Sequence, residues 1–198
     1  MTLLRLDQDK RAAGVKYNNT LILGIGNTLL CDEGAGIHAL NLFQSSYPDL
    51  PNLTFIDGGT LSFTLAAYIE DSDNLIVFDA TELKAPAGTV KTMAGRDMDA
   101  FLGAARRSPH EVSLLDLFDI ARLTGCLPAN RALIGIQPGS IEWGLSPTPE
   151  VAGALSIAVE QAVDLLGQWV RLEKKTSKSR PSGFDKAPSA GSIPGVTS

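Results

Sequence analysis

Residues 20–47 read TLILGIGNTLLCDEGAGIHALNLFQSSY and contain the signals from which the fold class can be predicted. The apolar run at 20–26 ends in glycines, which predicts a buried strand followed by a turn. Over residues 33–47 apolar side chains recur at helical spacing, and Pro48 closes the predicted helix. The chain therefore opens with a buried strand, a glycine turn and an amphipathic helix.

The same alternation continues downstream. Apolar runs predict strands at 53–56, 74–78 and 132–136, residues 61–70 are predicted to be helical, and the alternating segment 88–93 predicts an edge strand. Repeated strand–helix–strand units imply parallel strands joined by right-handed crossovers. We expect an α/β fold with a twisted, mostly parallel sheet of about five strands, helices on both faces and one antiparallel edge strand.

Two further helix starts carry capping signals. Ser108, Pro109 and Glu111 fit a capping box, and Gly125 is expected to end the helix that follows. Thr148 and Pro149 fit the start of a last helix. The apolar stripe expected on the first of these helices is Val112, Leu115, Phe118 and Leu123. The stripe expected on the second is Val151, Leu155, Val159, Val163, Leu166 and Val170.

Charge is spread unevenly along the 198 residues. The formal net charge is −5, but residues 171–198 hold six Lys or Arg and two acidic residues, so the rest carries −9. An acidic body argues against nucleic acid as a partner. We expect a loose leader at 1–17, one domain at 18–170 and a disordered basic tail at 171–198.

The composition of the chain also indicates the cellular compartment in which the protein is expected. No apolar run approaches the roughly 18 residues that a membrane span needs, so no membrane insertion is expected. Charges interrupt the N-terminal stretch where a signal peptide would be apolar. The two cysteines have no metal-finger or redox spacing. These features predict a cytoplasmic protein, expected to be a monomer.

Two carboxylates are candidates for a site. In the common doubly wound order the first strand lies between the second and the third, and ligands bind where the order reverses. Glu33 follows the first strand and Asp79 ends the third, so we expect them to face each other. Their repulsion should raise one pKa, and a bound cation or shared proton would relieve it. Alternatively, Glu33 complements a helix dipole and Asp79 caps a loop.

Histidine can complete such a site. The chain has two histidines. His110 is expected in the first helical turn, where the dipole disfavours imidazolium and leaves the neutral ring that a metal needs. Glu33, Asp79 and His110 would suit Ni²⁺, Zn²⁺ or Mn²⁺. Alternatively, His110 is an ordinary surface residue, and His38 is expected to be structural.

The first glycine turn does not fit a dinucleotide site. Leu29 stands where the fingerprint needs its third glycine. Asp32 and Glu33 would repel a pyrophosphate at the helix start. Gly24 and Gly26 are better explained by a tight turn, although a nucleotide-dependent enzyme stays open as a second class.

Five segments together resemble one family. They are LGIGNTLLCDEGAG (23–36), IDGGT (56–60), LIVFDA (75–80), SPHEVSLLDL (108–117), and GIQP with LSP (135–138 and 145–147). In the same order, and over residues 20–167, they resemble the hydrogenase maturation proteases, the endopeptidases that process nickel–iron hydrogenase large subunits. The resemblance implies a hydrolase with a twisted sheet flanked by helices, in agreement with the pattern above.

The resemblance also implies roles for particular residues. Family members bind a metal through a Glu, an Asp and a His, which match Glu33, Asp79 and His110. Asp57 matches a position tied to substrate recognition, although an Asp-Gly turn explains it equally well. The implied metal is nickel carried by the large-subunit precursor, and zinc or another divalent ion can occupy the site in isolation.

The implied reaction is removal of a C-terminal extension from the precursor after nickel insertion. Glu33 and Asp79 are the catalytic candidates. Either the metal activates the scissile carbonyl or water, with one carboxylate as base, or the metal only docks the substrate and a carboxylate activates water as in aspartyl proteases. A nickel-sensing binding protein or chaperone without proteolysis is the alternative. Trp143 and Gly144 could line a peptide groove or serve packing.

Overall fold

The computed structural model describes residues 19–104 and 112–178. Its strands are β1 (Thr20–Gly24), β2 (Leu53–Asp57), β3 (Asn74–Ala80), β4 (Val90–Ala94) and β5 (Asn130–Ile136). Its helices are the 3₁₀ helix η1 (Cys31–Gly34), α2 (Ala35–Ser46), α3 (Leu65–Glu70), α4 (Arg96–Ala104), α5 (Leu114–Leu123) and α6 (Pro149–Lys178).

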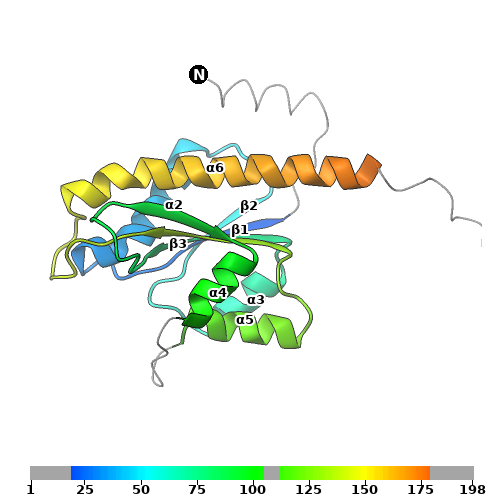
Figure 1. Ribbon diagram of the computed structural model, residues 1–198, viewed down its shortest axis with the longest axis horizontal. Coiled ribbons are helices and arrows are strands. Elements are labelled where there is room, and N and C mark those ends of the chain that lie inside the picture. Colours follow the sequence, from blue (N-terminus) through cyan, green and yellow to red (C-terminus); the bar gives the residue numbers. More distant parts are fainter. Residues whose placement is uncertain (1–18, 105–111, 179–198) are drawn as a thin grey trace, which may run out of the picture.

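The strands form one mixed sheet (Figure 1). Its order is β2-β1-β3-β5-β4, in which β2, β1, β3 and β5 are parallel and β4 pairs antiparallel with β5 at the edge. The predicted α/β class, the central place of the first strand and the antiparallel edge strand are all confirmed.

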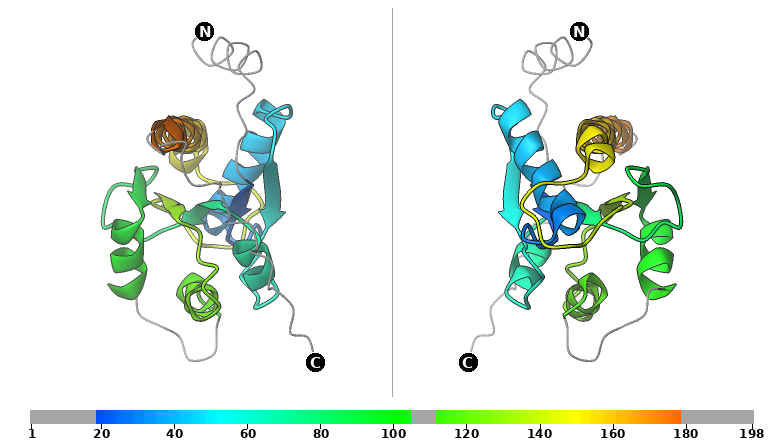
Figure 2. Two further views of the ribbon diagram at one scale, coloured as in Figure 1. Left: turned by 90° about the vertical axis from the view of Figure 1, so that its right-hand side faces the viewer. Right: turned by 90° about the vertical axis from the view of Figure 1, so that its left-hand side faces the viewer.

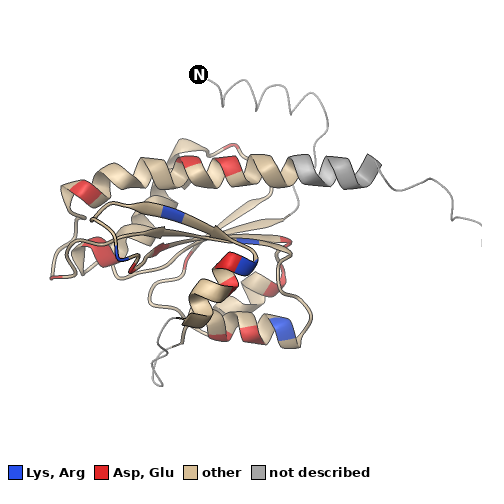
Figure 3. Ribbon diagram, viewed as in Figure 1, with Lys and Arg blue, Asp and Glu red and all other residues tan. Residues whose placement is uncertain are grey.

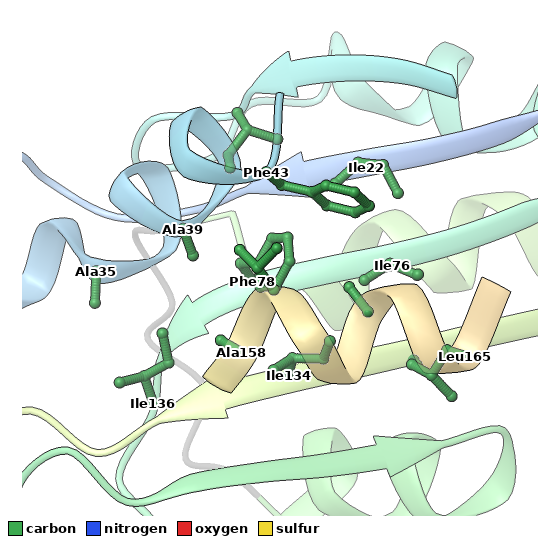
Figure 4. Packing of buried hydrophobic residues seen from close by; sticks show 14 of the residues in the cluster. Ile22, Ala35, Ala39, Phe43, Ile76, Phe78, Ile134, Ile136, Ala158 and Leu165 are labelled. Carbon is green, nitrogen blue, oxygen red and sulfur yellow. The ribbon is translucent and has the colours of Figure 1, made fainter. Parts of the chain in front are cut away.

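Helices cover both faces of the sheet (Figure 2). Helices α2 and α6 lie on one face, and α3, α4 and α5 lie on the other. Two separate apolar clusters fill the layers. On the α2 and α6 side, Phe43 meets Phe55 and Phe78 edge to face, above Ile22 of β1 (Figure 4). The sheet is therefore the middle layer of three.

Burial on both faces explains the apolar runs in β1 and β3. Leu21 and Leu23 point into one cluster, whereas Ile22 belongs to the other. Likewise Val77 and Phe78 of β3 belong to opposite clusters. A strand covered on both sides has no solvent face, so its sequence is continuously apolar rather than alternating.

Helix α6 begins at Pro149 as predicted and lies along the sheet. Its expected apolar stripe is confirmed: Val151, Val159, Leu166 and Val170 are buried. The helix continues to Lys178, past the boundary that we expected at residue 170. The sequence RLEKKTSK at 171–178 is rich in good helix formers, which explains the extension. The leader at 1–17 and residues 179–198 lie outside the described residues.

Helix α5 starts later than predicted. Ser108 and its neighbours to residue 111 lie outside the described residues, and Ser113 is the N-cap instead. The Ser113 hydroxyl accepts from the Asp116 N–H, and the Asp116 carboxylate accepts from the Ser113 N–H at 2.8 Å. The sequence holds two overlapping capping patterns, and the second one directly precedes the apolar residues that the core buries.

The apolar stripe of α5 is correspondingly different. Leu115 and Phe118 are buried as expected. Val112 precedes the helix but packs against the same apolar cluster, whereas Leu123 is exposed, so its assignment to the stripe was wrong. Gly125, with φ of 75°, follows the helix end as predicted.

Two other helical assignments needed correction. Helix α3 begins at Leu65 rather than near residue 61, because Leu61 has a positive φ of 71° that no helix accepts. Helix α4 was not predicted, since only Met98 on it is fully buried and its other positions carry a weak apolar pattern.

Acidic side chains outnumber basic ones on the described helices (Figure 3). Among the described residues no helix combines the length and apolar character that crossing a membrane requires.

Candidate active site

The carboxyl ends of β1, β2 and β3 meet at one edge of the sheet. Gly24, the last residue of β1, pairs with Asp57 on one side and with Phe78 on the other. Asp79 follows Phe78 directly, so Asp57 and Asp79 flank the turn that leaves β1. The strand order reverses between β1 and β3, which makes this turn the topological switch point of the sheet.

The turn after β1 is bonded to both neighbouring strands. The Ile25 N–H donates to the Phe78 carbonyl at 2.9 Å, and the Gly26 N–H donates to the Gly59 carbonyl at 2.9 Å. Gly26 has φ of 142°, and a Cβ there would lie 1.9 Å from the Glu33 carbonyl oxygen. The glycine is thus required by a close approach of two backbone segments, which confirms its predicted role in a tight turn.

Helix α2 also depends on a glycine. A Cβ on Gly36 would lie 2.2 Å from the Ile25 carbonyl oxygen and 2.3 Å from that of Phe78. The first turn of α2 therefore rests directly on the backbone ends of β1 and β3. This contact sets the position of the η1 turn that carries Glu33.

We expect Gly36→Ala to lower the free energy of unfolding by about 1–3 kcal/mol, because two backbone carbonyls must move to admit the methyl group. Urea unfolding would measure the change. Gly153→Ala is the matched control: it lies in α6, no atom lies within 4 Å of its added Cβ, and helix propensity alone should make it neutral or stabilising. Equal stabilities for the two variants would contradict the contact.

Glu33 and Asp79 interact across this edge. Glu33 lies in η1, and Asp79 is the second-last residue of β3. Burial and then the charge of Glu33 raise the pKa of Asp79 to about 8, against a smaller opposing effect of a backbone hydrogen bond at Ala80. The effect of the Glu33 charge on Asp79 agrees with the predicted juxtaposition of the two carboxylates and with a raised pKa for one of them. Their chemical roles stay predictions.

Asp32 is fully buried next to Glu33, and sequence reasoning missed its role. Its carboxylate accepts from the N–H groups of Gly139 (2.8 Å), Ser140 (2.9 Å) and Thr148 (2.6 Å), and from the Thr148 hydroxyl (2.9 Å). Burial opposes ionisation, but the bonds from Ser140, Thr148 and Gly139 outweigh it and lower the pKa of Asp32.

Segment 139–148, which follows β5, is thereby fixed against the η1 turn. The Cys31 N–H donates to the Gly144 carbonyl at 2.8 Å, and the Gly144 N–H donates to the Leu29 carbonyl at 3.0 Å. A Cβ on Gly144 would lie 2.4 Å from Cys31 Sγ, so a larger residue there would force the Cys31 side chain to move. Gly144 thus has a packing role, one of the two alternatives left open for it.

Asp57 is exposed at the end of β2. Its Oδ1 accepts from the Gly59 N–H at 2.9 Å, which forms the Asp-Gly turn that was one of its two explanations. This turn leaves the side chain at the site's edge, and its part in substrate recognition stays a prediction.

Only one of the two histidines, His38, lies within the described residues. His110 lies outside the described residues, and because α5 begins at Leu114, the argument that placed it in the first turn of that helix was wrong. His38 lies in α2, and within the described residues its buried Nε2 has no hydrogen-bond partner. In the same part of the chain no group of three or more His, Cys, Asp or Glu side chains is placed to hold a metal ion.

Two solved structures that share this architecture are hydrogenase maturation endopeptidases. The hydrogenase maturating endopeptidase HybD from Escherichia coli superposes with a TM-score of 0.68 at 29% identity, covering 76% of this chain and 93% of that chain. HybD from Thermococcus kodakarensis, a [NiFe] hydrogenase maturation protease, gives 0.61 at 28% identity, covering 75% and 99%. The fold therefore places the chain in a class of maturation endopeptidases.

Sequence comparison narrows the class to one family. The family model HycI, hydrogenase maturation protease, matches residues 37–165. The hydrogenase expression/formation protein HupD of Rhodobacter capsulatus is 37% identical over 155 residues, which are 78% of this chain and 74% of that protein. The hydrogenase 2 maturation protease of Escherichia coli is 33% identical over 147 residues, 74% and 89% of the two chains. The chain belongs to the hydrogenase maturation protease family and is an endopeptidase, as the five motifs predicted.

Proposed function

We propose that this endopeptidase removes the C-terminal extension of a nickel–iron hydrogenase large-subunit precursor once nickel has been inserted. The observation that carries the proposal is the Glu33–Asp79 pair, which lies where the strand order of the sheet reverses. In a family of maturation endopeptidases, paired carboxylates at that position are the natural acid–base or metal-binding groups. A cytoplasmic location and a monomeric state stay predictions.

Nickel enters this proposal as part of the substrate. Two facing carboxylates repel each other, and a divalent cation placed between them relieves that cost. Carboxylate and imidazole donors suit a borderline ion such as Ni²⁺. Glu33 and Asp79 would supply two donors, His110 the third, and precursor thiolates the rest. Zinc or another divalent ion could occupy the same donors in the isolated protein.

The two carboxylates can act on the peptide bond in two ways. With nickel present, the ion supplies Lewis acidity, and one carboxylate accepts the proton of the attacking water. If nickel does not occupy the pair, the raised pKa of Asp79, about 8, favours its protonated form at neutral pH, so that Asp79 would donate a hydrogen bond to the scissile carbonyl while Glu33 takes the proton of water. Both routes need both residues, and the second requires a proton on Asp79.

A nickel-dependent cleavage assay tests the proposal. Nickel-loaded and nickel-free precursors would be incubated with wild type and with His110→Ala, and loss of the extension followed by mass spectrometry. We expect cleavage of the loaded precursor only, and a loss of at least about 100-fold in kcat/KM for the variant, because it lacks one metal donor. Thermal unfolding of both proteins would control for folding.

Three outcomes would contradict parts of this proposal. Equal cleavage of nickel-free precursor would remove the nickel requirement. Undiminished cleavage by His110→Ala would remove His110 from the site. Binding of the loaded precursor without any cleavage by wild type would favour the nickel-sensing chaperone.

A further inference from the structure

Exposed apolar side chains gather beside the carboxylate pair. Eight large apolar side chains are exposed in the described part of the chain, and four of them lie on two short segments that are bonded to each other. These four are Leu29 (48% exposed), Ile141 (62%), Trp143 (82%) and Leu145 (73%), called here the Trp143 patch. Scattered exposed apolar residues are ordinary, but a concentration at one place indicates a binding surface.

The patch stands on fixed backbone. Gly144, between Trp143 and Leu145, exchanges hydrogen bonds with the 29–31 segment in both directions. The buried Asp32 carboxylate holds both ends of segment 139–148. Since the backbone is already ordered, a partner that covers these side chains loses little conformational entropy on binding.

Its position is set by the same contacts. The segment that bears Trp143 is bonded to Leu29, Cys31 and Asp32, and Glu33 is the next residue along the chain. The Trp143 patch therefore borders the proposed active site on the side of the η1 turn. An endopeptidase must hold its substrate chain on either side of the bond that it cuts, so substrate polypeptide must pass close to this border.

We propose that the Trp143 patch binds an apolar segment of the large-subunit precursor next to the scissile bond, a proposal that rests on the function proposed above. Large aromatic and aliphatic side chains are the usual anchors for a polypeptide partner. Glu142 is the one charged residue in segment 139–148, so the patch offers no cation for a nucleic acid or an anionic lipid surface. The chemistry matches a polypeptide that presents apolar side chains.

Binding and cleavage can be measured side by side. The probe is the nickel-loaded large-subunit precursor of the organism's own hydrogenase with its extension intact. Trp143→Ala and Leu145→Ala would be compared with wild type by biolayer interferometry and by steady-state cleavage. Leu123→Ala is the matched control for Leu145→Ala, because Leu123 is a leucine of similar exposure (89%) at the end of α5.

We expect Kd and KM to rise by about 30-fold for Trp143→Ala and by about fivefold for Leu145→Ala, with kcat within twofold of wild type. Leu123→Ala should leave all three constants within twofold. Unchanged Kd in both patch variants would overturn the proposal. A wild type that is dimeric by light scattering, and becomes monomeric as Trp143→Ala, would overturn it in favour of contact with a second copy.

The two proposals fail in different ways. If wild type binds the precursor but does not cut it, the proposed function fails, and the Kd values of the patch variants still decide the docking surface. If wild type cuts normally and the patch variants match it in Kd and KM, the docking surface fails and the proposed function stands.

Discussion

Asp79→Asn is expected to lower kcat/KM for precursor cleavage by at least about 10³-fold and, at alkaline pH, to make the folded protein more stable. The loss of activity follows because asparagine has no negative charge with which to bind a cation and no acidic proton to exchange with the substrate. The gain in stability follows because the wild-type carboxyl is buried beside the charge of Glu33.

The direction of the pH effect can be derived from the pKa of Asp79. It is raised from 3.8 to about 8 in the folded protein, so between these values the folded state holds a proton that the unfolded state has lost. The stability of wild type should therefore fall as pH rises from about 4 to about 8, and then level off. Asparagine does not titrate, so the variant's advantage should be near zero at pH 4 and complete above pH 8.

A pKa shift from 3.8 to about 8 would correspond to about 6 kcal/mol in the free energy of unfolding. Asp79 keeps partial contact with solvent, so we expect a gain of roughly 2–3 kcal/mol at pH 9. Thermal unfolding of metal-free protein from pH 5 to pH 9 would measure it. Glu33→Gln should lose activity similarly but show a weaker fall of stability with pH, because the charge that helps raise the Asp79 pKa is gone.

Asp97→Asn is the control for both effects, since Asp97 is an exposed residue in the first turn of α4. It should leave cleavage unchanged and add no comparable pH dependence. If Asp79→Asn cut the precursor at the wild-type rate, or were less stable than wild type at pH 9, the assignment of Asp79 to the site would be wrong.

Asp32→Ala is expected to lower the free energy of unfolding by about 3–5 kcal/mol, since it leaves several donors without their acceptor inside the protein. Asp32→Asn should recover little of this lost stability. Oδ1 accepts from the Thr148 N–H and Oδ2 from Gly139, Ser140 and the Thr148 hydroxyl, so an amide NH₂ must face a donor in either orientation. Urea unfolding at pH 7 would give the values.

The pKa of Asp32 adds a second test. It is lowered in the folded state, so the stability that this carboxylate contributes is present above its unfolded pKa and is lost as pH falls through the folded value. The gap between wild type and Asp32→Ala should thus narrow in acid. Asp99→Ala serves as the comparison, because its partly exposed ion pair with Arg131 lies outside the site and should cost only about 1–2 kcal/mol. If Asp32→Ala lost no more stability than Asp99→Ala, the role of Asp32 in holding segment 139–148 against the η1 turn would be contradicted.

The sequence was sufficient where burial alone determines the pattern. β1 and β3 are covered on both faces, so their apolar runs were unambiguous, and the strand order followed from general topology. The Glu33–Asp79 juxtaposition followed in turn, because each residue lies next to a strand end. The five family motifs then gave the enzyme class.

The features that the sequence did not predict depend on contacts other than the burial of apolar strands. The start of α5 depends on which of two capping serines precedes the buried residues, and local sequence cannot rank them. Asp32 was considered only as a charge near a helix start, because its partners lie 107 to 116 residues further along the chain. Side-chain-to-backbone bonds over such separations leave no periodic signal. A carboxylate that directly follows an apolar run and precedes a candidate catalytic residue was the one available hint.

The separation of Asp32 from its partners bears on how the protein is made. On the ribosome, Glu33 and Asp79 emerge long before Thr148, the last residue that bonds to Asp32. A nascent chain that ends after β3 already contains both carboxylates, but the groups that fix the η1 turn and present Trp143 have not yet been synthesised. The hydrogen bonds that hold the η1 turn in place can therefore form only after residue 148 has left the ribosome, well after both carboxylates have emerged.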